Sequence, residues 1–152
     1  MHSSTDYAAA LLSKARDDGY VVRSLSADAG APNWVIGFHA QQAVEKSVKS
    51  VLTRHEIEFP RTHNLSMLIE LLRRHAITLP PDADDLARLT PFGVALRYDD
   101  TAGEDELIIQ REWAVDVVSR MLDWAAWSVP VISGRCRLRP STATPCSRSP
   151  RS

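Results

Sequence analysis

The sequence predicts an all-α protein, an antiparallel up-and-down four-helix bundle with an additional short helix. Apolar residues recur at three- and four-residue steps through several stretches, as they do on one face of a helix. Turn-forming proline and glycine separate most of these stretches, and strand signals are weak throughout. With 152 residues, of which 44% are hydrophobic and 24% charged, the chain has the material for one domain around a single core.

The first predicted helix begins at a cap, Thr5 or Asp6, and runs to about Ala27. Charged residues such as Asp17 and Asp18 fall largely outside its apolar stripe. The stripe consists of Ala8, Leu11, Leu12, Ala15, Gly19 and Val22. Its spacing indicates that one side of this helix packs on the rest of the domain.

The second predicted helix covers residues 34–54 and is the central element of the domain. It follows a turn at residues 28–32, contains no proline, and can be capped by Asn33. Its apolar face consists of Ile36, Ala40, Ala43, Ser47, Val48 and Val51. Polar residues follow the same spacing on another face, so the helix can pack on a core and still present donors.

A linker at residues 55–64 leads to a short third helix. Thr62 or Asn64 is suited to cap it, and the apolar residues from Leu65 onward repeat at helical spacing. The basic run at residues 73–75 marks its end, because cations are favourable at a helix C-terminus.

The fourth helical segment begins after Pro80–Pro81, with Asp82 as its expected cap. Pro91 interrupts it, because proline lacks the backbone N–H and clashes with the preceding turn. We therefore expect a kink or a break near Thr90, with helix resuming through Tyr98.

Residues 99–105 have the composition of a loop, and the last helix is expected from Glu104 or Asp105 to Trp127. Ile108 would lie on its apolar face, together with Val115, Val118, Leu122 and Ala125.

Charge and composition divide the chain into a helical domain at residues 1–128 and a tail at residues 129–152. The tail is rich in Ser, Pro and Arg, which predicts disorder. It holds five arginines and no acid, whereas residues 1–128 carry a formal charge of -6. An acidic domain is poorly suited to non-specific nucleic-acid binding, so any contact with RNA or a nucleotide needs a local basic cluster.

Several classes of protein are excluded or disfavoured. No apolar run is long enough for a membrane span, and the N-terminus lacks the basic start of a signal peptide, so we expect a cytoplasmic protein without membrane contact. Both cysteines lie in the tail, and no Cys/His ligand pattern or phosphate loop is present. We expect no metal and no cofactor.

The candidate site is a set of polar residues on two elements: His39, Gln42, Lys46 and Lys49 on the central helix, and Arg97 and Tyr98 at the end of the fourth segment. Arginine suits bidentate phosphate contacts, and tyrosine suits stacking on a base. The alternative is a solvated helix side, with Arg97 and Tyr98 sealing a helix end against Asp99, Asp100 or Glu45.

Three ordered motifs are the most specific signal in the sequence. Residues 38–46, FHAQQAVEK, with Lys49, resemble the hallmark FHAQQAxEKxxK segment of the HEPN family (higher eukaryotes and prokaryotes nucleotide-binding). Residues 60–65, PRTHNL, match its P-x-T-H-D/N-L turn, and residues 95–98, ALRY, resemble the ending of its fourth helix. The similarity covers about residues 6–127.

The resemblance implies a helical bundle that homodimerises and is often encoded beside a minimal nucleotidyltransferase as a toxin–antitoxin pair. Catalytic members of the family are metal-independent endoribonucleases with an Arg-x4-6-His motif. The motif's arginine corresponds to Arg97, but no histidine occurs beyond His75. The usual proton carrier is therefore missing. Asp99 and Asp100 would also repel phosphates.

The leading hypothesis is therefore a dimeric, nucleotide-binding or nucleotidyltransferase-partner protein rather than an enzyme. In this hypothesis Arg97, Lys46 and Lys49 contact phosphate, and Tyr98 or His39 contacts base or ribose. Gln42 belongs to the same nucleotide-binding set. One alternative is a ribonuclease toxin that uses Arg97 with His39 or His63. The other is a helical interaction module without a ligand.

Overall fold

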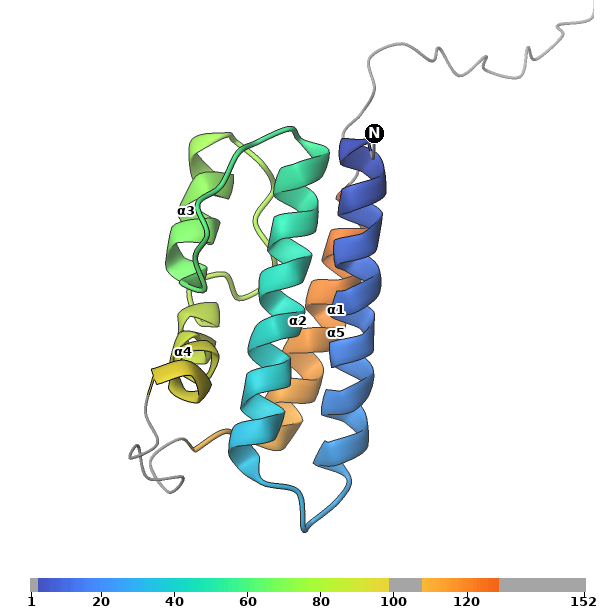
Figure 1. The fold of residues 1–152 in the computed structure, drawn as a ribbon, viewed down its shortest axis with the longest axis vertical. Coiled ribbons are helices and arrows are strands. Elements are labelled where there is room, and N and C mark those ends of the chain that lie inside the picture. Colours follow the sequence, from blue (N-terminus) through green and yellow to red (C-terminus); the bar gives the residue numbers. More distant parts are fainter. Residues whose placement is uncertain (1–2, 99–107, 129–152) are drawn as a thin grey trace, which may run out of the picture.

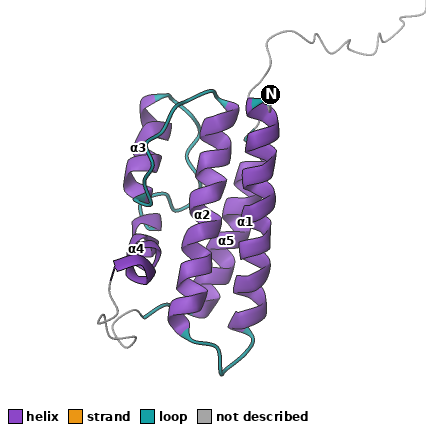
Figure 2. Cartoon of the chain, in the orientation of Figure 1, coloured by secondary structure: helices purple, strands orange, loops and turns teal. Residues whose placement is uncertain are grey.

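The computed structural model describes residues 3–98 and 108–128, with side-chain detail to Val94 in the fourth α-helix. These residues form helices and loops, and no strand occurs among them, which confirms the all-α prediction (Figures 1 and 2). The elements are α1 (Ser4–Ser26), α2 (Asn33–Arg54), α3 (Leu65–Arg74), the 3-10 helix η1 (Leu86–Leu89), α4 (Thr90–Tyr98) and α5 (Arg111–Trp127).

Helices α1, α2 and α5 pack side by side, and α3 and α4 lie along the other side of α2 (Figure 1). The α1–α2 pair is antiparallel, because Ser50 on α2 donates to the Ala8 carbonyl near the start of α1. Helix α5 runs in the direction of α2, with Arg111 bonded to Asn33 and Arg54 bonded to the Ala125 carbonyl. The segment between α2 and α5 therefore carries the chain from the end of α2 back to the level of the start of α2, as an up-and-down order requires.

The start of α1 differs from the sequence prediction. Ser3, rather than Thr5 or Asp6, is the N-cap, and its hydroxyl accepts from the Asp6 backbone N–H. The Asp6 carboxylate accepts from the Ser3 backbone N–H in return, which completes a capping box. The prediction offered Asp6 as the N-cap, but Asp6 is the third residue of the capping box, counted from the cap Ser3. Acidic and hydroxyl side chains suit both positions, so the sequence pattern alone does not separate them.

Asn33 is also not a cap. It is the first residue of α2, which follows Pro32 without a side-chain cap. The Asn33 amide oxygen instead accepts from Arg111, which also donates to the carbonyls of Asp28 and Ala31. A tertiary contact thus uses the polar group that the local pattern assigned to capping, and it ties the α1–α2 turn to the start of α5.

The prediction for α3 is confirmed. Asn64 is its N-cap and accepts from the Met67 backbone N–H, while Thr62 accepts from the Asn64 backbone N–H. The helix ends at Arg74, followed by His75 as C-cap.

The predicted break near Thr90 is confirmed as well, since η1 ends at Leu89 and α4 begins at Thr90. Pro91 thus occupies the first turn of α4, where a missing N–H costs no intrahelical hydrogen bond. Asp82 does not cap a helix: it has φ 53° in a turn, and its carboxylate pairs with Arg120 of α5. A left-handed backbone cannot serve as an N-cap, which needs an extended conformation.

Helix α5 begins at Arg111, later than the predicted Glu104 or Asp105, and residues 108–110 are not helical. Ile108 is 83% exposed, so its assignment to the apolar face was wrong. The next residue, Ile109, is buried instead. The predicted loop at residues 99–105 and the predicted tail at residues 129–152 lie outside the described residues, so the division at residue 128 stays a prediction.

The core surrounds α2, where every residue from Trp34 to Thr53 is buried or half-buried. Its largest fully buried apolar side chains are Ile36, Leu52, Leu65, Leu68, Leu72, Leu86, Leu89 and Met121. Burial of these side chains is the main stabilising term of the bundle. Among the described helices, none is long and apolar enough to cross a membrane.

Candidate functional site

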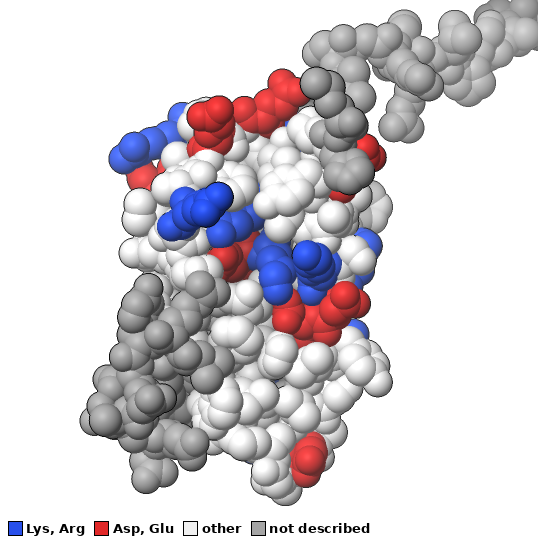
Figure 3. Space-filling view, viewed as in Figure 1, with Lys and Arg blue, Asp and Glu red and all other residues white. Residues whose placement is uncertain are grey.

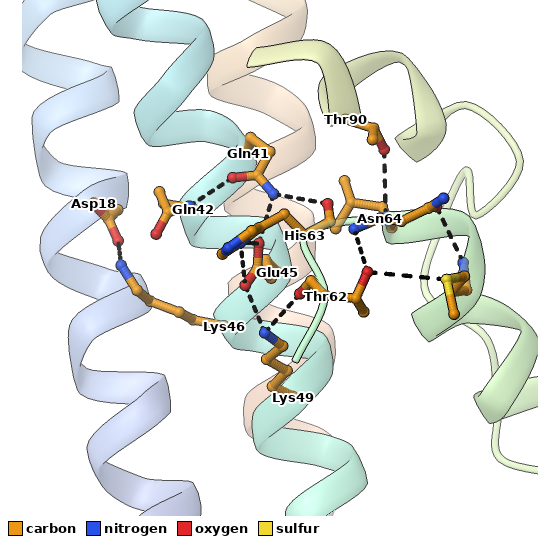
Figure 4. A network of polar contacts seen from close by, with 12 residues as sticks. Asp18, Gln41, Gln42, Glu45, Lys46, Lys49, Thr62, His63, Asn64 and Thr90 are labelled. Carbon is orange, nitrogen blue, oxygen red and sulfur yellow. Dashed lines mark hydrogen bonds and ion pairs between the residues drawn. The ribbon is translucent and has the colours of Figure 1, made fainter. Parts of the chain in front are cut away.

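Two clusters of charged and polar side chains lie on different faces of α2 (Figure 4). The α1-facing cluster consists of Asp18, His39 and Lys46. The linker-facing cluster consists of Gln41, Glu45, Lys49, Thr62 and His63. Both arise from helical spacing: positions 39 and 46 are two turns apart, and positions 41, 45 and 49 follow a four-residue step.

In the α1-facing cluster, one carboxylate of α1 holds two donors of α2. His39 Nδ1 lies 2.8 Å from Asp18 Oδ1, and Lys46 Nζ lies 2.5 Å from Asp18 Oδ2. The Asp18 side chain is 12% exposed, whereas those of His39 and Lys46 are 27% and 24% exposed. The carboxylate is therefore less accessible to solvent than either of its two donors.

The linker-facing cluster joins α2 to the linker before α3. Glu45 accepts from Lys49 at 2.6 Å and from Gln41 at 2.7 Å, and His63 Nδ1 lies 3.0 Å from its Oε2. Lys49 also donates to the Thr62 carbonyl at 2.9 Å. The Glu45 side chain is only 6% exposed, so this cluster is a buried ion pair whose polar atoms have several partners.

These contacts set the charge of Glu45. Burial by itself would raise the pKa of its carboxyl, but hydrogen bonds from Lys49, Gln41 and His63 and the charge of Lys49 outweigh burial and lower the pKa. Glu45 is therefore ionised at neutral pH and neutralises Lys49 directly.

The linker-facing cluster also contacts α4. A Cβ atom added at Gly93 would lie 2.6 Å from the Gln41 side-chain carbon, and one added at Gly37 would overlap the Phe92 ring. Only glycine permits the two helices to approach so closely at these points. The position of α4, and hence of its C-terminal end, therefore depends on the Gln41 amide and on Phe92.

The predicted site residues of α2 are thus divided between two places. His39 and Lys46 meet at Asp18, whereas Lys49 is held by Glu45, and Gln42 donates to the Gln41 amide oxygen at 2.7 Å. Arg97 lies on the backbone of α4, as does Tyr98. The side chains of these two residues lie outside the described part of the structure.

Sequence reasoning missed the two carboxylates that organise the clusters. Asp18 was placed outside the apolar stripe of α1, but it is 9% exposed and therefore belongs to the buried side. Its spacing of three residues from Ala15 was the available signal, since a charge in register with apolar residues indicates a buried partner. Glu45 was considered only as a partner of Arg97, although Lys49 at i+4 was a ready partner.

On the face shown in Figure 3, lysine and arginine side chains gather in a band, with acidic side chains directly beside them. Below the band the same face is largely uncharged. Nowhere in residues 3–98 and 108–128 do three or more His, Cys, Asp and Glu side chains gather as metal ligands would. The cations of this band therefore lie beside acidic groups and do not form an isolated basic patch.

The fold and site define an all-helical bundle whose central helix carries two sets of carboxylate, lysine and histidine. Residues 8–126 match the family model described as HEPN domain, which places the chain in that family. No curated protein and no solved structure matches the chain. The family is associated with ribonuclease or nucleotide-related function.

Proposed function

We propose that this HEPN protein binds the phosphates of a nucleotide or of RNA at the α1-facing cluster of α2. The observation that supports it most is that this cluster presents a lysine and a histidine that are more accessible to solvent than their shared carboxylate. Arg97, at the end of α4, supplies a cation for bidentate phosphate binding in this proposal.

Among the lysines, we assign the phosphate contact to Lys46. Its ammonium meets one acceptor among the described residues, whereas Lys49 is shared between Glu45 and the Thr62 carbonyl and also lies 5.6 Å from the Phe59 ring centroid. A phosphate would have to displace a buried carboxylate to reach Lys49, which is costly. Tyr98, His39 and Gln42 are the proposed contacts to base or ribose.

The test is a titration of the purified chain with nucleotides and with a short single-stranded RNA. Arg97→Ala should weaken binding at least about tenfold, since losing a charge-assisted hydrogen bond costs about 1.5–3 kcal/mol. Arg74→Ala is the control, because Arg74 is an exposed arginine of α3 paired only with Glu70 among the described residues. Equal binding by wild type and Arg97→Ala would refute the assignment.

We also propose that the chain forms a homodimer and works with a nucleotidyltransferase-family protein in a toxin–antitoxin-like pair. Support comes from the family and from Val94, which is 43% exposed on α4. Affinity purification of the tagged chain from its own cells, with light scattering of the eluate, tests both points. A stable partner of another class and no effect of nucleotide would favour an interaction module.

A second candidate function is a metal-independent ribonuclease that uses Arg97 with His39 or His63. One observation favours it: each histidine has a carboxylate at its Nδ1, Asp18 for His39 and Glu45 for His63. Such a contact orients an imidazole for proton transfer. Mixed cellular RNA, incubated with the protein in EDTA beside Arg97→Ala, tests it. Cleavage that disappears in the variant would support this function.

A further inference from the structure

We propose that His39 is a phosphoryl-accepting residue: its Nε2 takes a phosphoryl group from a phosphoramidate, a compound with a phosphorus–nitrogen bond, and carries it as phosphohistidine beside Lys46. Such a covalent modification of the chain goes beyond the binding of nucleotide or RNA phosphates. Three features support it: the orientation of the imidazole, the unused donors of the ammonium, and the contrast with two other histidines.

The imidazole of His39 is held so that its nucleophilic nitrogen is Nε2. Its Nδ1 lies 2.8 Å from Asp18 Oδ1, and Nδ1 carries the proton because a carboxylate only accepts. The lone pair is therefore on Nε2. The ring also meets Phe38 edge-on, with 5.3 Å between the ring centroids and 76° between the ring planes. These two contacts restrict the rotation of an imidazole that is still 27% exposed.

Lys46 is the cation nearest to hand for a phosphoryl group on His39. The imidazole and the ammonium contact different oxygens of one carboxylate, so they lie on neighbouring sides of Asp18. An ammonium has three donors, and among the described residues Lys46 Nζ uses one of them, on Asp18 (Figure 4). The other donors suit a bound phosphoryl group, which brings three strong acceptor oxygens and negative charge.

His63 also has a carboxylate at its Nδ1, but the lysine beside it is more fully occupied. Its Nδ1 lies 3.2 Å and 3.0 Å from the two oxygens of Glu45. Lys49 donates both to Glu45 and to the Thr62 carbonyl, and its side chain is only 14% exposed. At most one of its three donors is left for a phosphoryl group, so we expect His63 to be a poor acceptor.

His75 separates the effect of ring orientation from the effect of the lysine. Its Nδ1 contacts the Leu71 carbonyl at 2.9 Å, and a carbonyl also only accepts, so the lone pair of this ring is on Nε2 as well. His75 is exposed, but α3 contains no lysine, and both arginines of α3 are paired with carboxylates. It is therefore the internal reference for His39.

The transfer balances in charge and in electrons. The Nε2 lone pair attacks the phosphorus of the donor, a new nitrogen–phosphorus bond forms, and the donor's own phosphorus–nitrogen bond breaks. The leaving nitrogen takes that electron pair and, from phosphoramidate itself, departs as ammonia with the three hydrogens it already carries. The proton on Nδ1 stays in place, and the Asp18 carboxylate stabilises the positive charge of the phosphorylated ring, as it would that of an imidazolium.

Incubation of the purified chain with potassium phosphoramidate tests the proposal, with intact mass and peptide mapping as the readout. Wild type should gain one phosphoryl group on His39, about tenfold or more faster than on His75, because a charge-assisted hydrogen bond from Lys46 contributes that much. Lys46→Ala should remove most of this advantage, and Lys46→Arg should retain part of it. Circular dichroism confirms that each variant folds.

The isomer that forms reports whether Asp18 positions the ring. Wild type should give only the Nε2 isomer, since Nδ1 is bonded to Asp18, and phosphorus NMR separates the two isomers. Asp18→Ala should release Nδ1 and give a mixture, whereas Asp17→Ala, its exposed neighbour on α1, should not. A merely structural carboxylate would leave the isomer unchanged.

Labelling of His75 or His63 as fast as His39, or equal labelling of wild type and Lys46→Ala, would overturn the proposal. Nucleotide titration of the same preparation distinguishes it from the proposed function. Wild type that binds nucleotide but gains no phosphoryl group on His39 would overturn the acceptor and keep the binding function. Wild type that is phosphorylated on His39 but binds neither nucleotide nor RNA would do the reverse, and failure of both would overturn both.

Discussion

The two clusters of α2 contain the same three groups, a carboxylate, a lysine and a histidine, in different surroundings. Glu45 of the linker-facing cluster is 6% exposed and accepts from three side chains, whereas Asp18 of the α1-facing cluster accepts from two side chains that solvent reaches. The residue types therefore do not decide the role of a cluster. Burial and the number of partners decide it.

The clusters also differ in what they hold in place. The linker-facing cluster fixes the linker through the Thr62 and His63 carbonyls, and its Gln41 amide packs on Gly93 of α4. A hydrogen bond from the Leu65 backbone N–H to Thr90 joins the starts of α3 and α4 next to it (Figure 4). Loss of the linker-facing cluster should therefore disturb the fold, while loss of the α1-facing cluster should chiefly disturb the proposed ligand site.

The largest expected effect is from Glu45→Ala. It leaves the Lys49 ammonium buried without its carboxylate, and breaking a buried ion pair in this way costs about 3–5 kcal/mol. Urea unfolding followed by circular dichroism measures the loss. A cost no greater than that of Asp18→Ala would abolish the distinction between the clusters.

Gly93→Ala should cost less, about 1–3 kcal/mol, as overpacking of a core does. The new methyl group meets the Gln41 amide, which is buried and cannot swing away without losing its bonds to Glu45 and the His63 carbonyl. Gly30→Ala, in the exposed α1–α2 turn, is the control. If thermal melting shows equal effects, the close approach of α2 and α4 does not matter for stability.

Acid should remove part of the contribution of Glu45. Because its pKa is lower in the folded protein than in the unfolded chain, the ionised form stabilises the fold fully above a pH of about 4.5. That stabilisation is lost as the pH falls through the folded-state pKa. The difference in unfolding free energy between wild type and Glu45→Gln should thus be constant near neutral pH and shrink in acid.

Among the substitutions within the two clusters, the smallest effect on stability is expected for Asp18→Asn, about 1 kcal/mol, because its partners can still be hydrated. Salt should reduce this effect only slightly, because partly buried charge pairs are screened much less than exposed ones. Asp17→Asn should change the unfolding free energy by less than about 0.5 kcal/mol. A cost for Asp18→Asn as large as that for Glu45→Ala would show that the α1-facing cluster is structural.

The sequence by itself determined the features that depend on neighbours along the chain. Apolar spacing located the first three α-helices, Asn64 was one of two residues predicted to cap α3, and Pro91 predicted the break before α4. It also indicated the family, through motifs that the family match over residues 8–126 confirms. Local errors arose where several residues could fill the same role, as with Ser3 and Asp6 in the capping box.

Tertiary structure alone decided which charges of different elements meet. Asp18 is separated from His39 by 21 positions and from Lys46 by 28, and Gly93 reaches Gln41 from another helix. Helical spacing gives the direction of a side chain around its own axis, but not the rotation or height at which a second helix packs. The rotation and height of a second helix are set by the shape of the whole core, so the sequence named His39 and Lys46 as candidates and the fold brought Asp18 to them.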